Sequence, residues 1–174
     1  MIVDRGEMAG ALEELGLELE KRGISARLYM VGGAVMVLDF AVREVTDDID
    51  GGVYPAEKVL EVAAGIGERR GLHANWLNDA AKIYIPVFKA PDWRPVRKVG
   101  TLEIFAADAR AMLAMKMRAS RGTRDEVDLA FLLHECGITT VEEATSLYDE
   151  FFPEDPLPER ALPMIRFALA QPLS

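Results

Sequence analysis

Residues 31–50 have the sequence VGGAVMVLDFAVREVTDDID, and this stretch decides how the rest of the chain is interpreted. A strand is predicted to end at Gly32-Gly33, and an apolar helix is expected directly after it, over residues 34–42. Glycine lets a phosphate approach the backbone closely, and the first turn of a helix offers unpaired N–H groups. A Gly-Gly pair after a strand is more often only a tight turn, so this feature alone does not define a site.

Two aspartates follow on the next predicted strand, over residues 48–54. Because side chains alternate along a strand, Asp48 and Asp50 are expected on the same face. Adjacent carboxylates repel each other unless a cation lies between them, and Mg²⁺ commonly binds one or two carboxylates together with substrate phosphates. The alternative is that DDIDGG is a solvated acidic turn at the end of a strand. Combined with the glycines, the carboxylate pair favours metal-dependent phosphate chemistry.

Outside this stretch the hydrophobic periodicity predicts further helices and strands. Helices are expected at 5–22, at 57–70 after Pro55, from Asp108 to near Ser120, at 124–134, after a Thr140–Glu143 capping box, and at 159–170. Strands are expected at 25–31, 82–88 and 101–106, with a loop around Pro91, Trp93 and Pro95. This order predicts a single α+β domain, with a small mixed sheet flanked by helices over 1–107 and a helical part over 108–174.

The composition limits the class of protein. The chain has 174 residues, which suffices for one hydrophobic core, and its single Cys136 excludes a disulfide scaffold. No apolar run approaches the roughly 20 residues of a membrane helix, and residues 1–16 carry acids where a signal peptide needs a basic start. We therefore expect a soluble, cytoplasmic protein without a membrane partner.

Charge is distributed unevenly along the chain. The net charge is −9, which argues against a general nucleic-acid coat protein. Residues 82–124, however, contain ten Lys or Arg and three acids, a window of +7 inside a remainder of −16. This window predicts either a surface that faces a polyanion or charges that scatter over several solvated faces.

The order of these motifs resembles a known superfamily. The pattern Gly32-Gly33-Ala34, Arg43, Thr46, Asp48-Ile49-Asp50 is similar to the glycine and DxD motifs of the DNA polymerase β-type nucleotidyltransferases. The similarity is closest to the small bacterial branch around the AbiEii-type toxins of type IV toxin–antitoxin systems. The stretches WLNDAAKIYIP, TLEIFAADARAMLAMKMRASRG and TRDEVDLAFLL also fit that branch, so the resemblance covers roughly residues 28–133.

The resemblance implies a Mg²⁺- or Mn²⁺-dependent transfer of a nucleoside monophosphate from a nucleoside triphosphate (NTP) to a hydroxyl. The acceptor would be a tRNA-like RNA, a protein or a small molecule, and an antitoxin is an implied partner. Gly32, Gly33, Arg43 and Thr46 would bind the nucleotide, while Asp48 and Asp50 would hold the metal and act in catalysis. The alternative is a catalytically degenerate binding protein that retains the nucleotidyltransferase fold.

Two further groups are implied by the resemblance. Lys116 shares a helical face with Leu113, and it is either a snorkelling surface residue or a lysine that contacts phosphate. Asp128, with Asp125 one turn earlier, would join the catalytic set by orienting Lys116 or Arg118.

The sequence departs from the superfamily pattern at two points. Ala34 stands where many members have serine after the two glycines. Active members carry a third metal carboxylate on a later strand, and Glu103 is the single candidate in this chain. If Glu103 points elsewhere, the site has two carboxylates and binds one metal ion or is degenerate.

Overall fold

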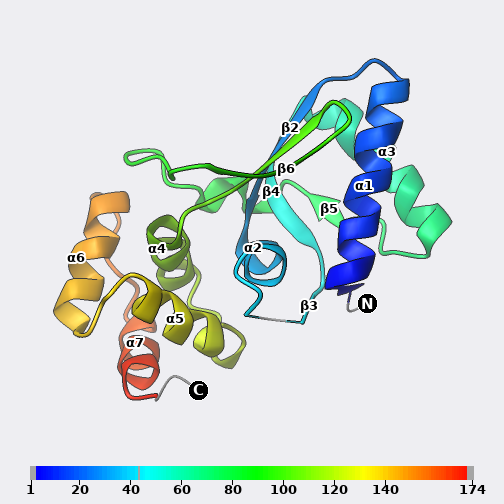
Figure 1. The fold of residues 1–174 in the computed structure, drawn as a ribbon. Coiled ribbons are helices and arrows are strands. Elements are labelled where there is room, and N and C mark those ends of the chain that lie inside the picture. Colours follow the sequence, from blue (N-terminus) through cyan, green and yellow to red (C-terminus); the bar gives the residue numbers. More distant parts are fainter. Residues whose placement is uncertain (1–2, 43, 172–174) are drawn as a thin grey trace. The chain divides into compact units, whose positions relative to one another are not determined.

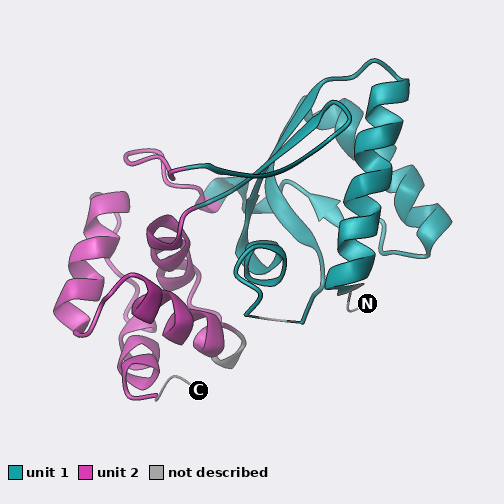
Figure 2. Cartoon of the chain, in the orientation of Figure 1, with its two compact units in different colours: residues 1–83, 93–107 teal, residues 84–92, 108–174 magenta. Residues whose placement is uncertain are grey.

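The computed structural model describes residues 3–42 and 44–171. The chain divides into two compact units (Figure 2). Unit 1 comprises Met1–Ile83 and Trp93–Ala107, and unit 2 comprises Tyr84–Asp92 and Asp108–Ser174. The predicted α+β class is confirmed, because a mixed sheet lies in unit 1 and helices make up most of unit 2.

Unit 1 is built on a five-stranded sheet with the order β5-β4-β2-β7-β6 (Figure 1). Its strands are β5 (Leu77–Asn78), β4 (Ile49–Tyr54), β2 (Ala26–Val31), β7 (Leu102–Ala106) and β6 (Arg94–Val99). β2 pairs antiparallel with β4 and parallel with β7, β5 runs parallel to β4, and β6 runs antiparallel to β7. A separate short pair joins β1 (Val3–Asp4) to β3 (Val45–Thr46).

Three α-helices and one 3₁₀ helix complete unit 1. They are α1 (Arg5–Lys21), α2 (Gly32–Leu38), α3 (Ala56–Arg70) and η1 (Ala80–Tyr84). α1 begins at Asp4, whose carboxylate accepts a hydrogen bond from the Glu7 N–H at 2.8 Å. α3 begins after Pro55 and ends at Gly71, which adopts the left-handed conformation that favours glycine at a helix C-terminus.

The two faces of the sheet differ in character. One face carries buried apolar side chains from the three central strands, namely Leu28, Met30, Ile49, Val53, Leu102 and Ile104. α1 packs closely on this face, because a Cβ atom on Gly16 would lie only 2.6 Å from the Cβ atom of Val99. By strand alternation the other face carries Tyr29, Asp50 and the side chains in register with them. The polar candidate residues therefore lie opposite the core.

The described part of unit 2 contains four helices. They are α4 (Ala109–Ala119), α5 (Thr123–Glu135), α6 (Val141–Phe151) and α7 (Ala161–Leu169). Asp108 caps α4, and Thr140 with Glu143 forms the predicted capping box of α6. No helix in the described part of the chain has the length and apolar character needed to cross a membrane.

Three local expectations differ from the structure. The strand expected at 82–88 is wrong, because this segment holds the end of η1 and leaves Ile83, Val87 and Phe88 exposed. β6 instead occupies the region expected as a loop, and its register shifts between Pro95 and Arg97. The helix expected at 34–42 is α2, which begins two residues earlier and ends at Leu38.

Candidate functional site

The glycine pair and the second aspartate lie side by side at the ends of paired strands. Asp50 on β4 is in register with Val31, the last residue of β2, and Gly32 follows directly. Gly32 has a φ of +68°, a conformation that L side chains rarely adopt. A Cβ atom at Gly32 would lie 3.9 Å from Oδ2 of Asp50. The backbone turn at Gly32 therefore borders the Asp50 carboxylate without an intervening side chain.

Gly33 is fitted against Thr46 in the same region. A Cβ atom at Gly33 would lie 2.5 Å from Oγ1 of Thr46, so this position has no room for a larger residue. The Thr46 side chain is buried, and its hydroxyl donates to the carbonyl oxygen of Asp48 at 3.3 Å. The structure thus brings together five of the predicted site residues, Gly32, Gly33, Thr46, Asp48 and Asp50, in one part of unit 1.

Asn78 orients the first aspartate. Its Nδ2 donates to Oδ2 of Asp48 at 3.0 Å, while its Oδ1 accepts from the Ala80 N–H at 3.0 Å. Asn78 lies on β5 in parallel register with Asp50. The sequence assigned Asn78 no role, although the stretch WLNDAAKIYIP contains it. The pairing of β5 with β4 reveals its position.

An open polar hollow lies beside Asp48. It has a volume of about 460 Å³ and is lined by Asp47, Asp48, His73, Asn75, Asn78 and Ala80. Nδ1 of His73 accepts a hydrogen bond from the Asn75 N–H at 3.2 Å, so a neutral imidazole there carries its proton on Nε2. The hollow therefore offers carboxylate, amide and imidazole groups to a ligand bound next to Asp48.

Glu103 is not the third carboxylate of this site, and that prediction is wrong. Glu103 does lie on the same face as Asp50, as the alternation in TLEIFA predicts, but it pairs in register with Arg27 at the other end of β2. Four residues separate Arg27 from Val31, a distance of about 13 Å along the strand. Glu103 instead accepts from Nε of Arg27 at 3.2 Å and lies 3.6 Å from the Lys98 ammonium.

The donor set near the glycines fits one hard cation. Carboxylate oxygens are suitable ligands for Mg²⁺, which completes its shell with water and substrate phosphates. Within residues 3–42 and 44–171, no group of three or more His, Cys, Asp or Glu side chains is arranged to hold a metal ion. Asp48 and Asp50 supply two carboxylates, so a cation held there would take its other ligands from water or a bound phosphate.

Lys116 and Asp128 form a different site, inside unit 2. Nζ of Lys116 lies 2.7 Å from Oδ1 of Asp125 and 2.6 Å from Oδ2 of Asp128. The Lys116 side chain is 4% exposed and both aspartates are 0% exposed. The contact of Asp128 with Lys116 agrees with the predicted orienting role, whereas Arg118 pairs with Asp155 at 2.8 Å.

The burial of Lys116 does not fit either of the two roles predicted for it. A snorkelling lysine keeps its ammonium in water, and a phosphate-binding lysine offers it to a ligand. In the structure the Lys116 ammonium is buried and contacts two carboxylates instead. Burial raises the pKa of Asp125, but the attraction of Lys116 and Arg121 outweighs it and leaves the pKa of that carboxyl below its ordinary value.

The basic window is neutralised by acids from elsewhere in the chain. Nine of its ten cations have described side chains, and each pairs with at least one carboxylate. They are Lys82, Lys89, Arg94, Arg97, Lys98, Arg110, Lys116, Arg118 and Arg121. Of their partners only Glu103 belongs to the window itself. The positive charge therefore does not form an unpaired patch among these nine residues.

Arg43 lies outside the described residues. α2 has only seven residues, so it has no long helix dipole to attract a phosphate. What Gly32 and Gly33 provide is backbone without side chains beside Asp50 and Thr46.

Comparison of the chain with protein-family models, with curated proteins and with solved structures found no match.

Proposed function

We propose that the chain is a Mg²⁺-dependent nucleotidyltransferase that moves a nucleoside monophosphate from an NTP to a hydroxyl acceptor. The observation that carries this proposal is the placement of Gly32 beside Asp50 at the paired ends of β2 and β4. Glycine backbone admits a phosphate, and a carboxylate pair suits a divalent cation. A cation–phosphate complex is the ligand that uses both features at once.

The reaction requires the phosphates to be held while an oxygen attacks. The acceptor hydroxyl oxygen forms a bond to the α-phosphorus, the bond from that phosphorus to the oxygen bridging the β-phosphate breaks, and pyrophosphate leaves with the electron pair. The hydroxyl proton is lost to solvent. Asp48 and Asp50 would hold Mg²⁺ or Mn²⁺, which when bound offsets negative charge on the phosphates. Asn78 holds Asp48 in place through its 3.0 Å hydrogen bond.

The class of acceptor is a narrower part of the proposal. An RNA end, a protein hydroxyl and a small molecule all present the required oxygen. Charge alone does not favour RNA as the acceptor, because cations of the basic window are paired with carboxylates. Long-range attraction to phosphates depends on unpaired cations. A cytoplasmic location belongs to the proposal through the composition, and an antitoxin partner through the sequence resemblance alone.

Transfer of label from α-³²P-labelled NTPs tests the proposal. The wild-type chain with Mg²⁺ is expected to label one of three supplied acceptor classes, an RNA mixture, a protein mixture or small hydroxyl compounds. Asp48→Ala and Asp50→Ala should each lower the rate by roughly 100-fold or more, because cation binding contributes several kcal/mol to such reactions. Asp79→Ala is the matched control, since Asp79 pairs with Lys82 at the surface.

No transfer by the wild type, or equal transfer by the Asp48 and Asp50 variants, contradicts the enzyme proposal. A second candidate, a nucleotide-binding protein without turnover, is favoured by the position of Glu103 away from Asp50. Calorimetry with Mg²⁺ and each of the four NTPs separates the two. Binding without label transfer supports the second candidate, and binding with transfer supports the first.

A further inference from the structure

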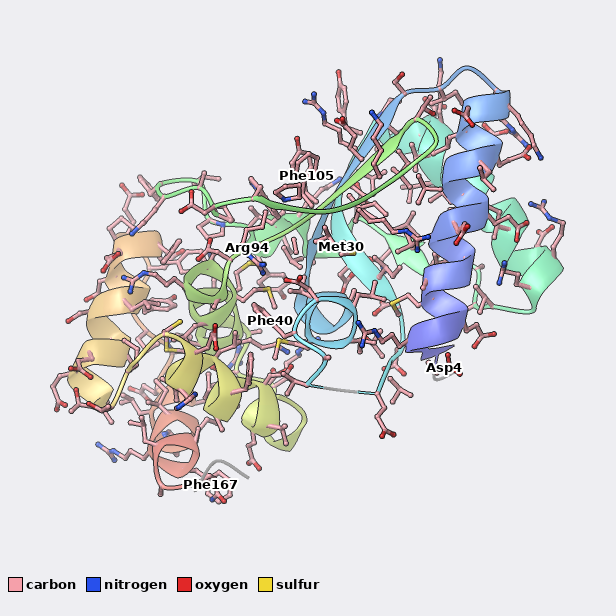
Figure 3. The ribbon with its side chains drawn as sticks, viewed as in Figure 1. Asp4, Met30, Phe40, Arg94, Phe105 and Phe167 are labelled. Carbon is pink, nitrogen blue, oxygen red and sulfur yellow. The ribbon has the colours of Figure 1, made fainter. Side chains whose placement is uncertain are left out.

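Three aromatic side chains gather on the same sheet face as Asp50. The rings of Tyr29 on β2 and Phe105 on β7 are stacked, with centroids 5.2 Å apart and planes inclined by 16°. Trp93 contacts Tyr29 in an edge-on arrangement at 5.0 Å. Figure 3 labels Phe105 and Met30, which lie on opposite sides of the strands. Phe105 belongs to the face of the site, whereas Met30 is buried in the core.

These aromatic rings are only half-buried, unlike those that fill the core. Trp76, for comparison, is 2% exposed and donates its indole N–H to the Ala63 carbonyl oxygen at 2.7 Å. Tyr29, Trp93 and Phe105 all fall in the intermediate class of exposure. Packing therefore accounts for the fully buried Trp76, whereas Tyr29 stays partly exposed beside Phe105 and Trp93.

The strand register leaves the Tyr29 ring without a side-chain neighbour on β4. β7 supplies Phe105 on one side of Tyr29, and on the other side the paired residue of β4 is Gly52, which has no side chain. Asp50 lies two residues from Gly52 on the same face, about 7 Å along the strand. This separation is comparable with the distance between the base and the 5′-phosphate of a nucleotide.

We propose that Tyr29, supported by Phe105 and Trp93, is a stacking platform for a nucleobase whose phosphate lies at Asp48 and Asp50. This inference rests on the proposed function. Every base has a π-face, so stacking on an aromatic ring tolerates all four bases. The base comes either from the NTP or from the end of an RNA acceptor, and both use the same ring chemistry.

The first arm of the test uses the wild-type chain and asks whether the base contributes to binding. Calorimetry with Mg²⁺ compares ATP, GTP, CTP and UTP with ribose 5-triphosphate, which has the phosphates but no base. We expect the four NTPs to bind within a few-fold of one another and about 10-fold or more tighter than ribose 5-triphosphate. This comparison needs no variant and is independent of any change in folding.

The second arm changes the ring. Tyr29→Leu should raise KM by about 10-fold, for the NTP if the base belongs to it or for a short single-stranded RNA if the base belongs to the acceptor. Tyr29→Phe should restore KM, because it keeps the ring and removes only the hydroxyl. Tyr84→Leu is the matched control, since Tyr84 is exposed and lies on η1.

The outcomes separate the inference from the proposed function. If Asp50→Asn abolishes transfer while Tyr29→Leu leaves both KM values unchanged and ribose 5-triphosphate binds as tightly as the NTPs, the platform is absent and the enzyme proposal stands. If Asp50→Asn leaves transfer unchanged, the proposed function fails, and the stacking inference fails with it.

Discussion

Two charged clusters in this chain use similar residues for opposite purposes. In unit 1 Asp50 lies beside the backbone of Gly32, and Asp48 borders an open hollow. In unit 2 Lys116 is enclosed by Asp125 and Asp128, with both contacts at or below 2.7 Å and almost no exposure. A buried charge must find its partners within the protein, whereas a carboxylate at an open site can accept a cation. Burial thus assigns the second cluster to the fold, and the first is the cluster for which we propose a ligand.

The largest expected effect comes from removing the buried cation. Lys116→Met leaves two buried carboxylates close together without their shared ammonium, which should lower the free energy of unfolding by about 3–5 kcal/mol. Urea denaturation followed by circular dichroism measures the change. The same substitution at Lys89, whose ion pair with Glu150 is nearly half-exposed, should cost only about 0–1 kcal/mol. Equal effects of the two substitutions would remove the distinction between the clusters.

A smaller loss of stability is expected from placing a larger residue at Gly33. Gly33→Ala places a methyl group 2.5 Å from Oγ1 of Thr46, so the free energy of unfolding should fall by about 1–3 kcal/mol. Thr46→Ala in the same chain should recover much of that loss, which a double-mutant cycle measures. Gly65→Ala is the matched helical control, because the nearest atom to a Cβ there is a flexible Arg69 nitrogen at 3.6 Å. Additive losses at Gly33 and Thr46 would contradict the described contact.

The smallest expected effect is a pH dependence from the buried cluster. The pKa of Asp125 is below its ordinary value in the folded chain, so its carboxylate stabilises the fold above about pH 4 and loses this contribution as the pH falls further. Denaturation curves from pH 7 to pH 2 should show a steeper acid loss in the wild type than in Asp125→Asn. Asp155→Asn, at a side chain that is 53% exposed, should leave the acid slope unchanged. A wild-type slope that Asp125→Asn does not alter would refute this role.

Much of the fold follows from local sequence patterns. The capping residues Asp108 and Thr140 mark helix starts that the structure reproduces, and the helix expected at 57–70 ends at Arg70. The error at 82–88 arises because β-forming residues predict a strand only when a face is buried, and Val87 is 86% exposed. β6 escapes prediction because five of its six residues are exposed and a bulge interrupts its alternation.

The site was predictable only where residues are close in sequence or on adjacent strands. Gly32, Gly33, Asp48 and Asp50 fall together because β2 and β4 are neighbours in the sheet. Glu103 shares their face, but its position along β7 depends on a strand register that no local pattern reveals. Lys116 illustrates the same limit, because helical spacing places it on an apolar face without showing that two aspartates enclose it.

The most direct test of the central claim compares Asp50→Asn with Glu103→Gln in the labelled-NTP transfer assay. Both changes replace one carboxylate by an amide on the same face of the sheet, about 13 Å apart along the strands. We expect Asp50→Asn to lower transfer by roughly 100-fold or more, and Glu103→Gln to retain wild-type transfer. Transfer that survives in Asp50→Asn, or is lost equally in both variants, would contradict the assignment of the site to Gly32, Gly33, Asp48 and Asp50.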